Sequence, residues 1–191
     1  MRNGWGGTPR RLVGMVLALA AVSAAGSTSA ATTAPPAKPG LQDDFLQNLV
    51  GDWTISRKIR DATEANTLKA EWVLDHEFVQ LHMKDVKEPP GYEALVLIGY
   101  DPAASEYVAY WCDTFGAQYA SVGRGKKAGN SIDFVFQYAE GPFHNTFTWD
   151  PGAKGWTFLM QAEEKDGSRR FFAEDTVRKA ASGAEKSSGG S

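Results

Sequence analysis

The chain has 191 residues, of which 42% are hydrophobic and 12% aromatic, and its 20 basic and 23 acidic residues give a formal net charge of −3. This composition excludes a disordered chain and a collagen-like repeat, and the single cysteine excludes a disulfide-stapled scaffold. No basic surplus is present to neutralise phosphates, which argues against nucleic acid as a partner. At this length one aromatic-rich domain is expected.

Residues 1–30 have the pattern of a secretory signal peptide. A positively charged start comes from Arg2, Arg10 and Arg11. An apolar run over 12–25 follows, and small residues come after it. This run is shorter than the roughly 20 residues that span a bilayer, so cleavage after Ala30 or Ala31 is favoured over an uncleaved anchor. The sequence predicts a secreted or periplasmic protein without a membrane attachment after cleavage.

Loss of this segment changes the charge and leaves one compact unit. The segment carries three basic and no acidic residues, so the mature chain has 17 basic and 23 acidic residues, a net charge of −6. That sign disfavours anionic lipid and nucleic acid as partners. Residues 31–40 are rich in proline and small residues and read as a flexible linker, and 180–191 read as a disordered tail. The folded unit is expected over 41–179.

The folded unit begins with a short helix and continues as strands. Apolar residues recur at helical spacing from Leu41 to Leu49, and Gly51 is a natural helix stop. Beyond it, apolar and polar residues alternate, and turns containing Pro, Gly and Asp separate the segments. About ten strands are expected, over 51–59, 67–74, 78–84, 92–100, 106–113, 117–123, 130–138, 143–150, 155–164 and 169–178.

The alternation also predicts which face of each strand is buried. Ile132, Phe134, Phe136 and Tyr138 share one face of their strand, and the pattern repeats on the next two strands. One large apolar face per strand, with no helix to cover it, favours a sheet closed on itself over a sandwich. The predicted fold class is therefore all-β, an antiparallel up-and-down β-barrel of about ten strands with a short N-terminal helix.

The two ends of the folded unit resemble the calycin superfamily, which includes lipocalins, fatty-acid-binding proteins and nitrobindins. A short helix leads into Gly51 and Trp53, and the last strand ends with Arg178. In calycins an arginine of the closing strand lies against the tryptophan and plugs the closed end. The resemblance thus implies a structural pair of Trp53 and Arg178, through a cation–π contact of roughly 0.5–2 kcal/mol.

The chain is also similar to a bacterial family of unknown function, number 1579. The similarity rests on three blocks in order, Phe45 to Trp53, Ala70 to Phe78, and Leu97 to Trp111, and covers about 42–178. It implies an exported calycin-like barrel and no established activity. Nitrobindins are more distant and bind haem through a histidine near the chain end, whereas 169–178 contains no histidine.

Three histidines are the candidates for metal, haem or acid–base chemistry. His76 lies in a tight turn where neighbouring side chains diverge, which favours a solvated turn over a metal site. Alternation places His144 on the outer face, so we expect an exposed side chain rather than a haem ligand. His82 alternates with apolar residues and is expected outside. If its face turned inward, it could pair with Asp113 for general acid–base chemistry.

Aromatic side chains at inward positions either fill the core or line a ligand cavity. A barrel of this size can hold one small ligand, which favours the cavity. The candidate ligand-binding residues are Trp72, Tyr92, Trp111, Phe134, Phe136, Phe147, Trp149, Phe158 and His82. No catalytic residue, metal site or cofactor is predicted, and the sequence does not define the oligomeric state.

Three functions are consistent with these features. The favoured one is a non-enzymatic exported barrel that binds a small hydrophobic or aromatic ligand. The second is a haem-binding protein or a barrel enzyme that uses His82 or His144. The third is a structural or interaction protein whose barrel is filled by its own side chains.

Overall fold

The computed structural model describes residues 39–181. The predicted signal peptide (1–30), nearly all of the predicted linker (31–40) and most of the predicted tail (180–191) lie outside the described residues. No helix in the described part is long and apolar enough to cross a membrane.

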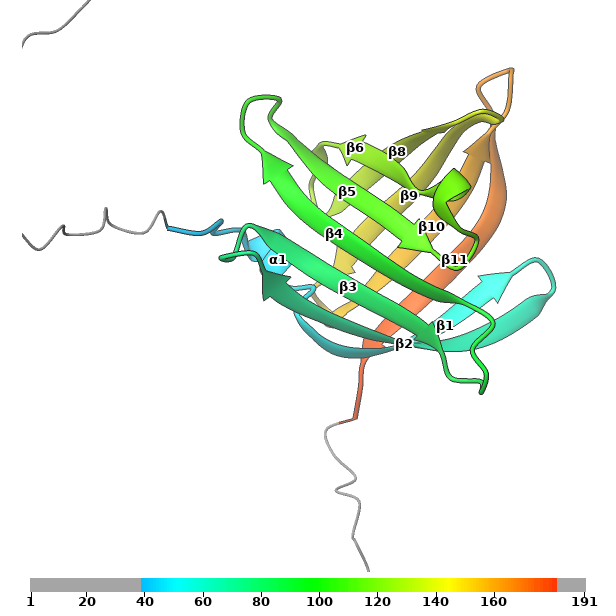
Figure 1. Ribbon diagram of the computed structural model, residues 1–191, viewed down its shortest axis with the longest axis horizontal. Helices are drawn as coiled ribbons and strands as arrows, with labels where there is room; N and C mark the ends of the chain where they lie inside the picture. Colours follow the sequence, from blue (N-terminus) through cyan, green and yellow to red (C-terminus); the bar gives the residue numbers. More distant parts are fainter. Residues whose placement is uncertain (1–38, 182–191) are drawn as a thin grey trace, which may run out of the picture. The chain divides into compact units, whose positions relative to one another are not determined.

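A single antiparallel sheet makes up the fold (Figure 1). Its first half contains α1 (Asp44–Gln47), β1 (Gly51–Ile59), β2 (Ala62–Val73), β3 (Phe78–Asp85), β4 (Glu93–Asp101) and β5 (Glu106–Asp113). A 3-10 turn, η1 (Ala117–Tyr119), leads into the second half. That half contains β6 (Ser121–Gly125), β7 (Lys127–Ala128), β8 (Ser131–Tyr138), β9 (Gly141–Asp150), β10 (Gly155–Glu163) and β11 (Arg169–Lys179).

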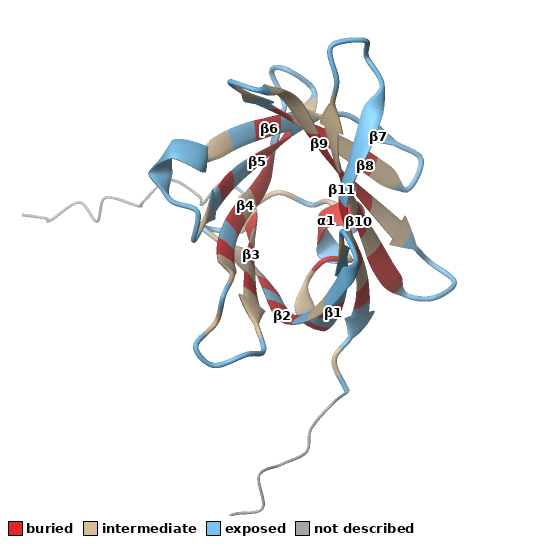
Figure 2. Ribbon diagram, turned by 90° about the vertical axis from the view of Figure 1, so that its right-hand side faces the viewer, coloured by how far each residue is buried: buried red, intermediate tan, exposed pale blue. Residues whose placement is uncertain are grey.

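Two pairings between distant segments close the sheet into a barrel. β1 pairs with β11, and β6 pairs with β8, so that ten strands form the ring and the two-residue β7 lies beside it. Figure 2 looks into this ring and shows α1 through it. The predicted antiparallel barrel of ten strands with a short N-terminal helix is therefore confirmed.

The largest differences from the predicted strand boundaries arise from local turn geometry. β2 begins at Ala62 rather than at residue 67, because a tight turn pairs Ile59 directly with Ala62. The predicted strand 117–123 is divided, since Gly116 adopts a positive φ of 95° and the chain forms η1 before β6 begins. Glycine adopts this backbone region without steric cost.

The β6–β8 seam, defined by the pairs Gly123–Phe136 and Arg124–Val135, depends on glycine. A Cβ atom on Gly125 would lie 2.2 Å from the backbone oxygen of Asp133, and one on Gly123 would lie 2.6 Å from the ring of Phe136. The strands can approach closely enough to pair only because these two positions have no side chain.

Helix α1 closes one end of the barrel. Asp43 caps it by accepting a hydrogen bond from the amide of Leu46 at 2.8 Å. The other carboxylate oxygen of Asp43 accepts a hydrogen bond from the Tyr107 hydroxyl at 2.6 Å, which ties the helix to β5. Phe45 is buried and meets Trp156 edge to face, with ring centroids 5.0 Å apart. We call this the closed end.

The cation over Trp53 at the closed end belongs to Lys179, which corrects the expected pairing with Arg178. The Lys179 ammonium lies 3.7 Å from the Trp53 ring centroid, and Trp53 is the register partner of Lys179. Arg178 pairs with Thr54 instead and therefore points outward. Gly51 makes room for this contact, since its φ is 133° and a Cβ atom there would lie 2.4 Å from the lysine nitrogen.

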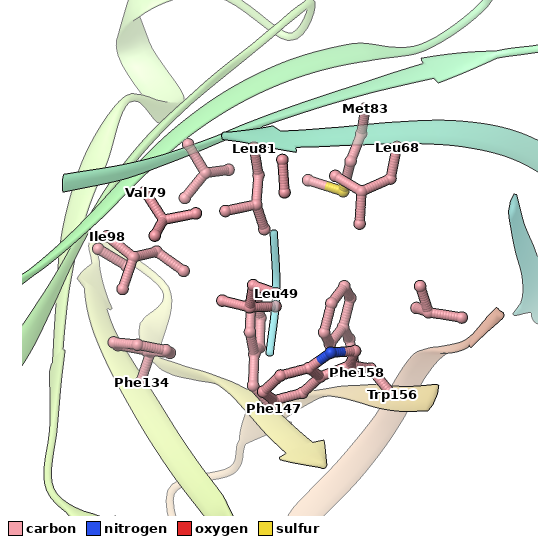
Figure 3. Packing of buried hydrophobic residues seen from close by; sticks show 14 of the residues in the cluster. Leu49, Leu68, Val79, Leu81, Met83, Ile98, Phe134, Phe147, Trp156 and Phe158 are labelled. Carbon is pink, nitrogen blue, oxygen red and sulfur yellow. The ribbon is translucent and has the colours of Figure 1, made fainter. Parts of the chain in front are cut away.

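The half of the barrel next to the closed end is filled with side chains. Phe147 and Phe158 stack with centroids 3.9 Å apart, and Phe134 meets Phe147 at 5.4 Å. Aliphatic residues of the opposite wall, including Leu81 and Ile98, converge on them (Figure 3). These buried contacts form the packed core, which we call the filled half.

Candidate functional site

The main cavity of the described structure lies at the end of the barrel opposite α1. Its volume is about 770 Å³, and its walls include residues at the β1–β2, β3–β4, β8–β9 and β10–β11 turns. α1 leads into the first residue of β1, whereas Ile59 at the other end of β1 lines the cavity. We call this the open end.

Three of the nine predicted ligand-binding residues line the cavity: Tyr92, Trp111 and Phe136. Phe134, Phe147 and Phe158 belong to the filled half, and Trp149 packs on Trp156 near the closed end. Alternation shows that a side chain points inward, but it does not show at which level along the barrel axis the side chain lies. This is why inward aromatics of both halves entered one predicted site.

Trp72 also lies away from the cavity. Its indole nitrogen donates to the Gln47 side chain of α1 at 2.8 Å, and its ring stacks on His76 at 3.9 Å. His76 is half-buried, and its Nδ1 lies 2.8 Å from the Leu41 carbonyl oxygen, so the expected solvated turn is only partly solvated. Within residues 39–181, no group of His, Cys, Asp and Glu side chains is arranged to hold a metal ion.

The sequence prediction missed five aromatic residues of the cavity wall, which are Phe115, Tyr119, Tyr138, Phe143 and Phe172. Phe115 and Tyr119 follow β5 in chain order, and Tyr138 and Phe143 flank the β8–β9 turn at the open end. Phe172 lies at the register shift between β10 and β11. For Tyr138 and Phe143, an aromatic residue at an inward position next to the β8–β9 turn is the sequence signal that would have found them. Phe115 and Tyr119 lie outside the strands, so alternation gives no signal for them.

Arg57 of the cavity wall forms a buried ion pair with Asp175, which lies behind it. Arg57 donates to both carboxylate oxygens of Asp175, with each nitrogen–oxygen distance 2.7 Å. Burial would lower the pKa of Arg57, but the hydrogen bonds and charge of Asp175 raise it above its ordinary value. The guanidinium also lies over Tyr92, 4.9 Å from the ring centroid. The two charges of the pair thus compensate each other.

Two buried amides also face the cavity. Asn66 is 2% exposed and Asn145 is 3% exposed. The Asn66 nitrogen donates to the Asp85 carboxylate, which fixes the orientation of that amide. The Oδ1 atoms of Asn66 and Asn145 have no hydrogen-bond partner among the described residues. A buried acceptor left unpaired costs about 1–3 kcal/mol.

His82 lies outside the barrel, so its inclusion among the ligand-binding residues is corrected. Val79, Leu81 and Met83 are buried, and His82 between them points outward with its side chain 40% exposed. Its Nε2 lies 2.5 Å from a carboxylate oxygen of Glu93. The considered pair with Asp113 does not form, because Asp113 lines the cavity on the other face of the sheet.

His144 also points outward, as expected, but it is buried. Only 3% of it is exposed, because Nδ1 contacts Asp133 and Nε2 contacts Glu163, each at 2.9 Å. Arg169 donates to the same Asp133 oxygen at 2.9 Å, and Thr146 donates to its other oxygen. The expected exposure was wrong because side chains of neighbouring strands cover the ring. Neither His82 nor His144 lines the cavity.

The cluster around His144 predicts acid sensitivity. Burial tends to raise the pKa of Asp133, but the hydrogen bonds and charges of His144, Thr146 and Arg169 outweigh it and lower the pKa. The stabilisation is therefore complete above the unfolded-state pKa of about 3.9 and is lost as pH falls through the lower folded-state pKa. We expect Asp133→Asn to destabilise the protein at pH 7 and to have a smaller effect at pH 3.

Urea unfolding at both pH values measures this difference. Asp61→Asn is the matched control, since Asp61 is exposed in the β1–β2 turn and has no ion-pair partner within the described residues. An equal loss of stability for Asp133→Asn at pH 7 and pH 3 would contradict the role assigned to the cluster.

The arrangement defines the class of the protein. A ten-stranded antiparallel barrel, with a helix across one end and a cavity at the other, is a calycin-like β-barrel. The chain belongs to the family described as "Protein of unknown function (DUF1579)", whose model matches residues 38–177. The resemblance inferred from the sequence blocks is thus confirmed. Comparison with curated proteins gives no match.

Proposed function

We propose that this protein is an exported, non-enzymatic barrel that binds one small hydrophobic or aromatic ligand in the cavity at the open end. The observation that carries the proposal is the cavity itself. Its volume of about 770 Å³ falls within the range of about 300–1,000 Å³ that is usual for small-molecule sites.

The composition of the cavity wall also supports binding. Aromatic residues make up much of it, and a few buried polar groups lie among them, notably Asn66, Asn145 and Arg57. Apolar walls with a small number of oriented polar groups are typical of ligand pockets. A haem or acid–base site based on His82 or His144 has no comparable support, because both side chains lie on the outer face.

Uptake of N-phenyl-1-naphthylamine, a neutral apolar fluorophore, tests the proposal. We expect its emission to rise on addition of the purified protein and to saturate at one molecule per chain. Ala162→Trp places a large ring in the cavity and is expected to weaken uptake at least about tenfold, since bulk replaces the space for the ligand.

The matched control is Ala128→Trp, which adds the same ring at an exposed position on β7 and should leave uptake unchanged. Absence of uptake by the unmodified protein, or equal uptake by both variants, would contradict the proposal. Export is tested separately, by locating the protein in periplasmic or culture fractions and sequencing its N-terminus, where cleavage near Ala30 is expected.

A further inference from the structure

We infer that the ligand of this cavity carries a protonated amine on its apolar body. This inference rests on the proposed function and specifies the chemistry of the ligand's polar end. It follows from three independent properties of the cavity wall, which are its charge balance, its unpaired acceptors and the aromatic rings around Asp113.

The charge of the cavity wall is strongly negative. Three basic residues line it, Arg57, Lys87 and Arg170. Six acidic residues line it, Glu64, Asp85, Asp113, Glu140, Glu163 and Glu164. The excess of three negative charges attracts a cation and repels an anion inside a space with low-dielectric walls.

The basic residues of the wall are already engaged. Arg57 is held by Asp175, Lys87 by Glu64, and Arg170 by Glu164, the last at 2.6 Å. A ligand carboxylate could take over the two hydrogen bonds of Arg57 only by displacing Asp175. That would leave the Asp175 charge, which is 1% exposed, without compensation. The wall therefore selects against anionic ligands.

The two buried side-chain atoms of the wall that have no hydrogen-bond partner within the described residues are both acceptors. They are Asn66 Oδ1 and Asn145 Oδ1. The Asp85 carboxylate next to Asn66 adds further acceptor oxygens. A group that only donates fits such a set, and an ammonium has three N–H donors and no acceptor.

Asp113 lies among aromatic rings in the same cavity. It accepts a hydrogen bond from the Trp111 indole at 3.2 Å. Its negative charge, together with the larger effect of burial, raises the pKa of Tyr92 to about 12 and that of Tyr138 by a smaller amount. Both phenols therefore stay neutral at pH 7. A carboxylate beside neutral aromatic faces favours a cation through charge attraction and cation–π contact.

Three probes with the same aromatic body test the inference at pH 7 by calorimetry: 1-naphthylmethylamine, 1-naphthylmethanol and 1-naphthylacetate. We expect the amine to bind at least about tenfold more tightly than the alcohol, and the carboxylate to bind most weakly. The preference for the amine should shrink as salt is added, because screening weakens charge attraction.

Two variants test which residues of the cavity wall produce the preference for the amine. Asp113→Asn is expected to weaken amine binding about tenfold and to leave alcohol binding unchanged, whereas Asp52→Asn, on the outer face near the closed end, should change neither. Asn145→Leu removes an unpaired acceptor. It is expected to raise the unfolding temperature while it weakens amine binding, so it reports on the site even if Asp113→Asn does not fold.

The outcomes separate the two proposals. Equal affinity for the three probes, or a preference for the carboxylate, contradicts the inference that the ligand carries an ammonium group. Either result still agrees with the proposed ligand-binding function. Uptake of N-phenyl-1-naphthylamine without binding of any naphthyl probe also contradicts the inferred ammonium group. Failure to bind any of the four compounds overturns the proposed function.

Discussion

Replacement of Arg57 by methionine is expected to lower the free energy of unfolding by about 3–5 kcal/mol, since it leaves a buried carboxylate without its partner. Asp175 is 1% exposed, and Arg57 forms two hydrogen bonds with it. Burial raises the pKa of Asp175 and Arg57 lowers it. In the variant only the effect of burial remains, so Asp175 takes up a proton more readily, and the loss of stability should shrink as pH falls.

A double-mutant cycle provides the control. Asp175→Leu alone leaves the guanidinium buried and unpaired, whereas Arg57→Met with Asp175→Leu removes both charges. The double variant is expected to be close to the unmodified protein in stability or above it, because apolar residues of similar volume often replace a buried ion pair without loss. Urea unfolding of the four proteins measures the cycle. Additive effects of the two single substitutions would contradict the assigned pairing.

Replacement of Phe158 by alanine is expected to lower the free energy of unfolding by about 3–5 kcal/mol, because it leaves a void in a close-packed region. The Phe158 ring stacks on Phe147 at 3.9 Å and lies 6.2 Å from Trp156. Ligand binding at the open end should be retained below the unfolding temperature, since Phe158 does not line the cavity.

Phe172→Ala is the matched control for the loss of a phenylalanine. Phe172 lines the cavity and is 37% exposed, so its removal deletes fewer packing contacts and should cost less than about 1 kcal/mol. Thermal and urea unfolding of both variants measure the contrast. A similar loss of stability for the two would show that the division into a filled half and an open cavity is wrong.

Much of the fold could be predicted from local chemistry. Strand 51–59 and strand 106–113 were assigned with their observed bounds, because turn residues mark their ends and apolar residues alternate between them. Closure of the barrel followed from the same alternation, since each strand had one apolar face that no helix could cover. The β6–β8 seam of the barrel could not be predicted from alternation. β6 is short, and its pairing with β8 requires glycines where the two strands approach closely.

The site was less predictable, because it depends on the level of each side chain along the barrel axis and on the register between paired strands. Tyr92 and Phe158 are both inward aromatics, yet one lines the cavity and the other is core. The choice of Lys179 over Arg178 as the partner of Trp53 follows from a one-residue register that the sequence does not specify. The burial of His144 depends on Asp133 and Glu163, which are remote in sequence from each other.

The separation of the filled half from the open end has a consequence for how such a protein can diversify. Folding stability is concentrated in side chains such as Phe147 and Trp156, whereas ligand selectivity would reside in wall positions such as Phe172 and Ala162. A larger or smaller residue at a wall position changes the volume open to the ligand without opening a void in the packed half. Under the proposed function, ligand specificity would therefore change through successive substitutions while the barrel keeps its stability.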